Sequence, residues 1–270
     1  MKPNIPRIIS VTSGKGGVGK TNFVTNIAIV FKTLQKKVLL MDADIGLSNI
    51  DIMFGVAPKF NIKHVLSGEK SLKDIVLNTS YGVDIIPASS GIKELTNLTL
   101  EGKVKIIEEL EQINDTYDIF LIDTAAGISD NVVFFCSAAH DVVVIVTSEP
   151  TSIADAYALI KVLHKEYGEK SFRVVVNNVK ELKEGRETFR KLSMVAERFL
   201  GVNLDFVGYL PYDEKIKEAI IAQKPYISLY PTNEFSKRLT EIAKQILKKE
   251  VNLVKGGVQF FLKKALSFNP

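Results

Sequence analysis

Short apolar stretches alternate with amphipathic stretches along most of the chain. The apolar stretches are nearly continuous, as in strands buried on both faces, and they fall at 7–11, 37–41, 83–86, 118–122, 141–146, 172–176 and 206–210. Between them, apolar residues recur at helical spacing over 22–34, 103–113, 153–167, 187–199 and 233–250. This alternation predicts an α/β fold with a doubly wound, mostly parallel sheet. A ligand is then expected at the carboxyl ends of the strands.

The composition is that of one globular unit. Of the 270 residues, 46% are hydrophobic, and no linker-like or low-complexity segment interrupts the chain before about residue 250. We expect one domain over 1–250, followed by a separate segment over 251–270. The net charge of +4 is too small to indicate nucleic-acid binding. The single cysteine, Cys136, excludes a disulfide framework or a CxxC metal site within one chain.

The segment 14–21 reads GKGGVGKT and matches the phosphate-binding pattern GxxxxGK[ST], the Walker A motif of P-loop NTPases. It lies between the first predicted strand and the first predicted helix, a context that a chance match would lack. Glycines let backbone N–H groups curl around phosphate oxygens, and the start of the helix adds partial positive charge. Lys20 should reach the β- and γ-phosphates, and Thr21 should offer its hydroxyl to Mg²⁺. The residues expected to hold the nucleotide here are Gly14, Lys15, Gly16, Gly17, Val18, Gly19, Lys20, Thr21 and Asn22.

Three aspartates stand at the ends of predicted strands. Asp42 and Asp44 follow the second strand in MDADIG, and Asp123 ends the run YDIFLID, which fits a Walker B motif. A carboxylate in such a position can orient water or bind the metal, often through water. Any one of these aspartates could instead cap a loop, but the three together predict a catalytic and metal-binding edge.

Lys15 gives the loop the form KGGxGK[ST], in which the chain resembles the MinD/ParA family of dimerising ATPases. In that family the matching lysine crosses a dimer interface to touch the partner's nucleotide. The resemblance implies an ATP-dependent homodimer in which Lys15 acts in trans beside Lys20. It also implies that Asp44 positions the attacking water, while Asp42, Asp123 and Thr21 belong to the metal network.

The resemblance also suggests where the adenine lies. Asn177, at the end of FRVVVN, matches the family's adenine-binding asparagine, with the neighbouring Asn178 as the alternative register. Pro211, in GYLPYD, stands where the adenine-contacting loop of the family begins, although a simple turn proline explains it equally well. The cofactors implied are ATP or ADP and Mg²⁺.

Longer stretches resemble one branch of that family, FlhG (also called FleN or YlxH), which regulates the placement and number of flagella. They are DADIGLSNIDIMFGVAPKFNIKHVLSGE, IDTAAGISDNVVFF and SEPTSIADAYALIKVL. The implied partners are the GTPase FlhF and flagellar switch-ring proteins, although no DQAxxL-type motif, which stimulates FlhF in many such proteins, precedes the first strand. A MinD-type division-site regulator shares every catalytic residue and stays open as an alternative. A ParA-type DNA-segregation ATPase and a non-hydrolysing scaffold are weaker alternatives.

The end of the chain is basic and amphipathic, with six lysines and one acidic residue from position 244 onward. A helix there would bear lysines on one face, which suits an anionic bilayer, and MinD and FlhG proteins have a membrane-targeting helix at this position. The residues on its apolar face are Val258, Phe261, Leu262, Ala265 and Leu266. A helix packed on the domain needs the same periodicity. We expect a cytoplasmic protein, peripherally associated with the inner face of the cell membrane, because no stretch resembles a signal peptide or a membrane span.

Overall fold

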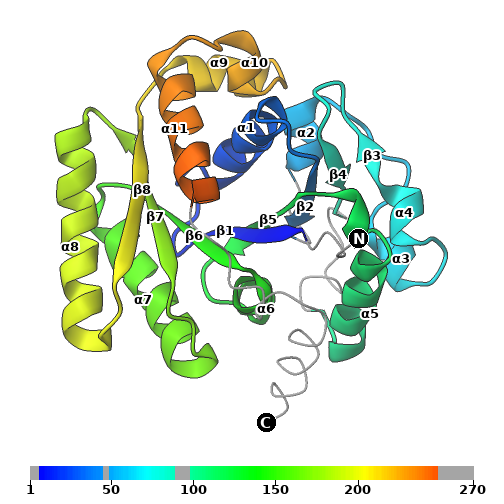
Figure 1. Cartoon of the computed structure of the whole chain (residues 1–270), viewed down its shortest axis with the longest axis horizontal. Coiled ribbons are helices and arrows are strands. Elements are labelled where there is room, and N and C mark those ends of the chain that lie inside the picture. Colours follow the sequence, from blue (N-terminus) through cyan, green and yellow to red (C-terminus); the bar gives the residue numbers. More distant parts are fainter. Residues whose placement is uncertain (1–5, 45–48, 89–97, 249–270) are drawn as a thin grey trace.

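An eight-stranded sheet forms the centre of the computed structural model, which describes residues 6–44, 49–88 and 98–248 (Figure 1). The strand order is β3-β4-β2-β5-β1-β6-β7-β8, and every neighbouring pair is parallel except β3 with β4. The strands are β1 (Arg7–Ser13), β2 (Val38–Ala43), β3 (Leu77–Asn78), β4 (Asp84–Ile86), β5 (Ile119–Ala126), β6 (Asp141–Val146), β7 (Phe172–Val179) and β8 (Leu204–Pro211). The predicted doubly wound α/β fold is confirmed.

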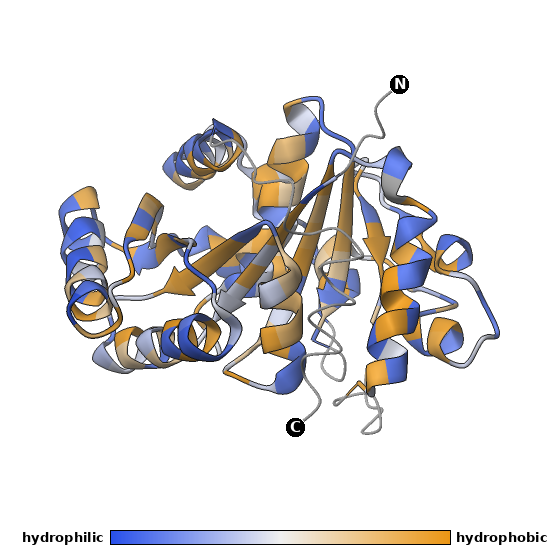
Figure 2. Ribbon diagram, turned by 60° about the horizontal axis from the view of Figure 1, so that its bottom comes forward, coloured by the Kyte–Doolittle hydropathy of each residue, from blue (hydrophilic) through white to orange (hydrophobic). Residues whose placement is uncertain are grey.

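Helices cover both faces of this sheet (Figure 1). Strand β6, with its run of valine and isoleucine, is buried throughout, and the helices turn their apolar sides toward the sheet (Figure 2). The helices of the described residues are α1 (Lys20–Thr33), α2 (Ile50–Phe54), α3 (Ile62–Leu66), α4 (Leu72–Ile75), α5 (Leu100–Glu111), α6 (Asp130–Ala138), α7 (Pro150–Tyr167), α8 (Leu182–Leu200), α9 (Lys215–Ile221), α10 (Tyr226–Leu229) and α11 (Glu234–Lys248). None of them is both long and apolar enough to cross a bilayer.

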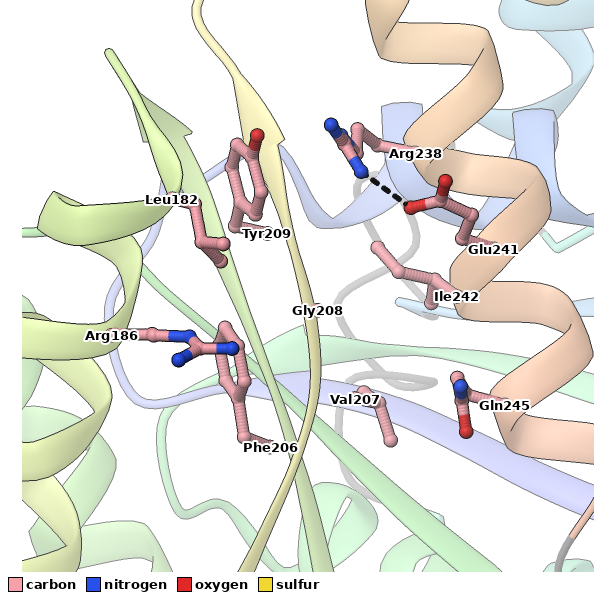
Figure 3. Close-up of a pocket in the computed structure, with 10 residues that line it drawn as sticks. All are labelled: Leu182, Arg186, Phe206, Val207, Gly208, Tyr209, Arg238, Glu241, Ile242 and Gln245. Carbon is pink, nitrogen blue, oxygen red and sulfur yellow. Dashed lines mark hydrogen bonds and ion pairs between the residues drawn. The ribbon is translucent and has the colours of Figure 1, made fainter.

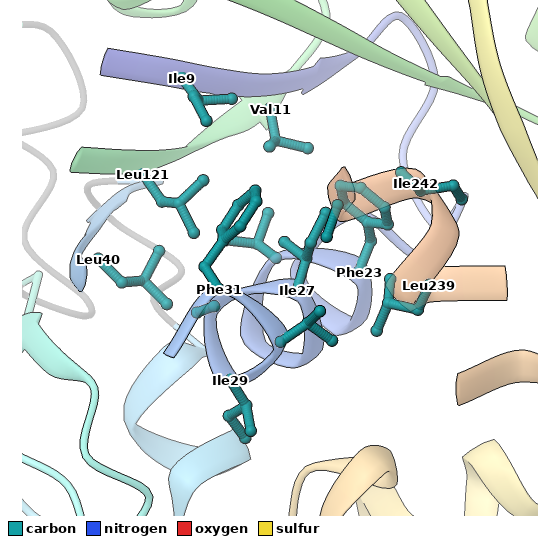
Figure 4. Packing of buried hydrophobic residues seen from close by; sticks show 14 of the residues in the cluster. Ile9, Val11, Phe23, Ile27, Ile29, Phe31, Leu40, Leu121, Leu239 and Ile242 are labelled. Carbon is teal, nitrogen blue, oxygen red and sulfur yellow. The ribbon is translucent and has the colours of Figure 1, made fainter. Parts of the chain in front are cut away.

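The core on one face is built around α1, the helix that follows the phosphate-binding segment. Phe23, Ile27 and Phe31 of this helix pack under the strands and are almost fully buried. Leu239 and Ile242 of α11 close the same cluster from the side (Figure 4). On the opposite face, α5 to α8 pack in two further clusters. The start of α1 is thus held rigidly at the carboxyl end of the central strand β1.

A buried ionic cluster ties the last helix to the amino ends of the strands. Asp141 accepts from Arg7 Nε at 2.6 Å and pairs with Arg173 at 2.9 Å. The two arginines also donate to the carbonyls of Leu247 and Ile246, in the last turn of α11. Because burial of a charge is costly without a partner, this cluster fixes where α11 ends. The predicted segment 251–270, which starts a few residues later, lies outside the described residues.

Candidate nucleotide site

The phosphate-binding segment turns sharply between β1 and α1. Gly17 and Gly19 have φ angles of 77° and 90°, which residues with a β-carbon rarely adopt. Gly14 has a different constraint, because a β-carbon there would lie 2.1 Å from the backbone carbonyl carbon of Asp155 in α7. Gly16 has open space around it. The loop therefore depends on glycine for its turn and for the close approach of α7.

Lys20 is the first residue of α1, and its side chain is largely buried. Its Nζ lies 3.1 Å from Oδ1 of Asp123, whose side chain is 1% exposed. The parallel register explains this meeting, because Asp123 in β5 stands beside Val11 in β1 and beside Asp42 in β2. The structure thus brings the predicted phosphate lysine and the predicted Walker B aspartate together at the carboxyl edge of the sheet.

Asp42 anchors the loop that follows its strand. Its Oδ1 accepts from the backbone N–H of Asp44 at 3.0 Å, and its Oδ2 accepts from Asn49 and Ile50 at 3.1 and 3.2 Å. These bonds hold the start of α2, so the buried carboxylate has a structural task whether or not it also serves a metal. Thr21, the other predicted metal residue, is half-buried at the start of α1.

Asp44 is half-buried and electrostatically coupled to both Lys20 and Asp123. Burial raises the pKa of Asp44 above its ordinary value; the Lys20 ammonium opposes that rise, and the Asp123 carboxylate adds to it. The predicted water-positioning carboxylate therefore stands in the same charge cluster as the phosphate lysine.

The side chain of Lys15 lies on the solvent-exposed side of the phosphate-binding loop. Its Nζ donates to the carboxylate of Glu149 and, at 3.0 Å, to the hydroxyl of Thr151, both at the start of α7. The Lys15 side chain is 34% exposed, so it is held on its own chain without being buried. Neither of its two partners was predicted from the sequence.

Asn177 bridges β7 and the loop. Its Nδ2 donates to the carbonyl of Val18 at 2.7 Å, and its side chain faces a cavity of about 770 Å³. Clefts of this size commonly hold a small ligand. The phosphate loop forms one wall, and the segment that begins at Pro211 forms the other. Residues 15–19 and Asn22 of the predicted phosphate-binding segment therefore lie at one cavity with the predicted adenine-binding residues, and Asn178 lines it too. Gly14, Lys20 and Thr21 of the same segment do not line this cavity.

Two buried polar atoms beside this cavity have no hydrogen-bond partner among the residues that the structure describes. They are Nδ2 of Asn22 and Oγ1 of Thr147, and both residues line the cavity. Buried polar groups without a hydrogen bond are rare in folded proteins, and their position here fits a site that binds a polar ligand. Thr147 was not predicted, although it directly follows strand β6 at the edge where ligands bind.

The described residues contain no cluster of three His, Cys, Asp or Glu side chains suited to a metal ion. A hydroxyl and a single carboxylate beside a phosphate loop still fit Mg²⁺, which usually keeps several waters and binds phosphate oxygens. The donors present are therefore compatible with a metal that arrives with its nucleotide.

Comparisons with known proteins agree with this geometry. A family model described as an AAA domain matches residues 6–174. The antiactivator FleN of Pseudomonas aeruginosa is 41% identical over 240 residues, which cover 89% of this chain and 86% of FleN. The flagellum site-determining protein YlxH of Helicobacter pylori is 33% identical over 268 residues, which cover 97% of this chain and 90% of YlxH.

Two solved structures have the same fold. MinD in the MinC:MinD cell division complex of Aquifex aeolicus aligns with a TM-score of 0.75 at 27% identity, covering 90% of this chain and 96% of that one. MinD of Pyrococcus horikoshii, solved with Mg-ADP, also gives a TM-score of 0.75, at 22% identity and with the same coverage.

The sheet order, the phosphate loop and the acidic strand ends define a P-loop ATPase of the MinD/ParA class. Within that class the identity to the two flagellar proteins exceeds the identity to the two MinD structures. The chain belongs to the FleN/YlxH family of flagellar regulators, also called FlhG.

Proposed function

We propose that this protein is an ATP-driven dimerisation switch that controls the placement and number of flagella at the membrane. The observation that carries the proposal is the identity of 41% to the antiactivator FleN across 89% of the chain. The name of the Helicobacter relative, a flagellum site-determining protein, points the same way.

In this proposal Lys20 binds the β- and γ-phosphates of ATP, and the backbone N–H groups of 14–19 surround them. Arrival of the phosphates gives the Lys20 ammonium a second anionic partner beside Asp123, with which it pairs at 3.1 Å. Thr21 and Asp123 would hold Mg²⁺, with Asp42 supporting them from the loop, and the ion would neutralise phosphate charge.

Lys15 acts between two chains. In the single chain its amine contacts Glu149 and Thr151 at an exposed rim, so it can leave them without breaking the core. In the dimer it would reach the partner's nucleotide and neutralise the charge that grows during transfer, as an arginine finger does. Asp44 would hold the attacking water, and its ionised form would accept that water's hydrogen bond.

Asn177, Pro211 and Asn22 would bind the nucleoside end of ATP. All three line the same cavity. One N–H of the Asn177 amide already donates to the carbonyl of Val18, so its second N–H and its carbonyl oxygen are left to pair with the base. Adenine offers a matching pair of groups, an exocyclic amino donor beside a ring nitrogen that accepts.

The membrane contact is assigned to a helix with Val258, Phe261, Leu262, Ala265 and Leu266 on one face, which lies outside the described residues. The support is the basic and apolar pattern of the sequence alone. Deletion of 255–270 should abolish ATP-dependent binding to anionic liposomes while leaving the fold of the ATPase domain intact, with an unchanged thermal unfolding midpoint. Unchanged liposome binding would remove the membrane role from the proposal.

The proposal is tested by expressing the chain in a bacterium that lacks its own FleN and counting flagella by electron microscopy. Restoration of the normal number is expected from the wild type, and not from Lys15→Ala. Size-exclusion chromatography with light scattering should give a dimer with ATP and a monomer with ADP. A monomer under both nucleotides would refute the switch, and an unaltered flagellar count would refute the flagellar role.

The proposal includes binding to partner proteins. FlhF and switch-ring proteins follow from the FleN/YlxH family, and the small net charge of +4 gives no support for nucleic acid. The likeness to MinD in its complex with MinC keeps division-site control as the second candidate. Pull-down with ATP should recover flagellar basal-body proteins, whereas recovery of MinC-like proteins alone would favour that second candidate.

A further inference from the structure

Strand β8 is an open edge of the sheet. It pairs with β7 on one side, and it has no strand neighbour on the other side within the described residues. Residues 205–208 in its middle are half-exposed, whereas 174–176 in the neighbouring β7 are fully buried. The opposite edge strand, β3, has only two residues. A long strand with one free side can pair its backbone with another extended segment.

A groove runs along this free edge between α8 and α11 (Figure 3). It has a volume of about 390 Å³, and a second hollow of about 370 Å³ shares Phe206, Val207 and Gln245 with it. Together the two hollows follow β8 from Leu204 to Tyr209, which is about 20 Å at roughly 3.3 Å per residue. A groove of this length beside a strand edge fits an extended peptide of about six residues. We call it the β8 groove.

The side chains of the β8 groove that have no ion-pair partner among the described residues are cationic. Arg238 bridges Glu234 and Glu241 at 2.8 Å each, and Arg173 pairs with Asp141. Asp205, the other carboxylate of the lining, interacts electrostatically with Arg173. Arg186, from α8, and Lys248, at the end of α11, make no ion pair with another described residue. They stand on opposite sides of the strand, so a segment in the groove meets a cation from each helix.

The positive charge of the β8 groove favours some binding segments over others. The chain's own segment after residue 250 carries three lysines and no acidic residue, so the groove repels it. A second copy of β8 would bring the same cations against each other. The pairing register with β7 also skips Val207, and such bulges discourage indiscriminate pairing between edges.

We propose that the β8 groove binds an extended acidic segment of a partner protein, which adds a strand to the sheet. Backbone pairing along residues 204–209 would supply the attachment, and apolar side chains of the segment would meet Phe206 and Val207. Acidic side chains would meet Arg186 and Lys248. This contact needs neither nucleotide nor dimerisation, because the groove lies wholly outside the residues that line the nucleotide cavity.

The test uses the full ¹⁵N-labelled chain and an acetylated, amidated heptapeptide of alternating glutamate and valine. Saturable NMR shifts and slowed hydrogen exchange are expected at the amides of 205–208, with Kd on the order of 0.1–1 mM. Two control peptides separate the contributions: one has its strand-facing amides N-methylated, and one has lysine in place of glutamate. Neither should bind.

Protein variants give the matched comparison. Arg186→Glu should weaken binding by roughly fivefold or more, whereas Arg190→Glu, an exposed change on the same helix outside the groove, should leave it unchanged. Equal binding of the N-methylated or lysine peptide, or equal loss in both variants, would overturn the proposal. It would also be overturned if deletion of 251–270 exposed the β8 amides, or if Arg186→Glu dissolved a nucleotide-independent dimer.

Discussion

Replacing Gly19 with alanine should strain the phosphate loop and dislodge Asn177 at the same time. Gly19 has φ 90° and ψ 22°, and an added β-carbon would lie 2.4 Å from Nδ2 of Asn177. That nitrogen holds the carbonyl of Val18 at 2.7 Å. Since no contact as short as 2.4 Å survives, either the loop or the asparagine has to move.

The magnitude follows from two effects. A residue with a β-carbon in this backbone conformation costs about 1–3 kcal/mol of strain. Loss of the Asn177 hydrogen bond adds about 0.5–1.5 kcal/mol. Gly19→Ala should therefore lower the free energy of unfolding by about 1.5–4.5 kcal/mol, and Asn177→Ala alone by about 0.5–1.5 kcal/mol.

The assay is urea unfolding of the two single variants and the double variant, with the affinity for a fluorescent ATP analogue measured in parallel. Because both single changes remove the same hydrogen bond, the double variant should lose less than the sum by about 0.5–1.5 kcal/mol. Gly201→Ala is the matched control, since Gly201 has φ 66° but open space around its missing β-carbon. It should cost about 1 kcal/mol and leave ATP affinity unchanged. Additivity within about 0.5 kcal/mol would refute the reasoning.

Three further outcomes are expected. Asp141→Asn should destabilise the fold by about 3–5 kcal/mol, because it leaves the buried Arg173 and the half-buried Arg7 without their carboxylate. The exposed Glu234→Gln should cost less than about 1 kcal/mol, and equal urea midpoints for the two variants would contradict this. Burial, with help from a hydrogen bond to a carboxylate, raises the pKa of Tyr117 above its ordinary 10.0, so stability should be intact below that pH and fall as the pH rises above it. Tyr117→Phe should flatten that fall in urea titrations between about pH 9 and 11, and an unchanged slope would count against the assignment. Because the pKa of Asp44 is raised above 3.8, ATP turnover should begin to decline at a pH higher than 3.8 as the solution is acidified. Asp44→Asn should slow phosphate release by about a hundredfold or more while ATP still drives dimerisation.

The sequence predicts the parts of the fold that have a clear period. Every strand and helix expected from the apolar pattern before residue 250 is present in the described residues, with ends shifted by a few residues. The amphipathic helix expected after residue 250 stays a prediction, because it lies outside the described residues. Helix α6 was missed, because residues 131–138 are all buried and an all-round apolar helix has no polar face to reveal its period. The helices α2, α3, α4, α9 and α10 have at most seven residues, too few for a periodic signal.

The candidate site also has a part that the sequence predicts and a part that only the structure shows. The phosphate loop is readable because its chemistry lies in eight consecutive residues. The contact of Lys20 with Asp123 joins residues 103 positions apart, and only the pairing of β1 with β5 brings them together. Glu149 and Thr151 belong to the family-like stretch SEPTSIADAYALIKVL and Thr147 directly precedes it, but nothing in that stretch indicates a role for these three side chains. Their places beside the cavity and Lys15 become visible only in three dimensions.

The central position of β1 has a consequence for synthesis on the ribosome. This strand is made first, yet its partners lie far ahead: Arg7 pairs with Ile119, and Ile9 pairs with Asp141. At roughly 5–20 residues per second, on the order of ten seconds pass before β6 is complete. Until β5 and β6 are made, the nascent chain carries a complete nucleotide motif on an apolar strand that lacks both of its neighbours in the sheet. Asp123, the partner of Lys20, is also missing until β5 is made, so we expect the nascent chain not to bind ATP before then.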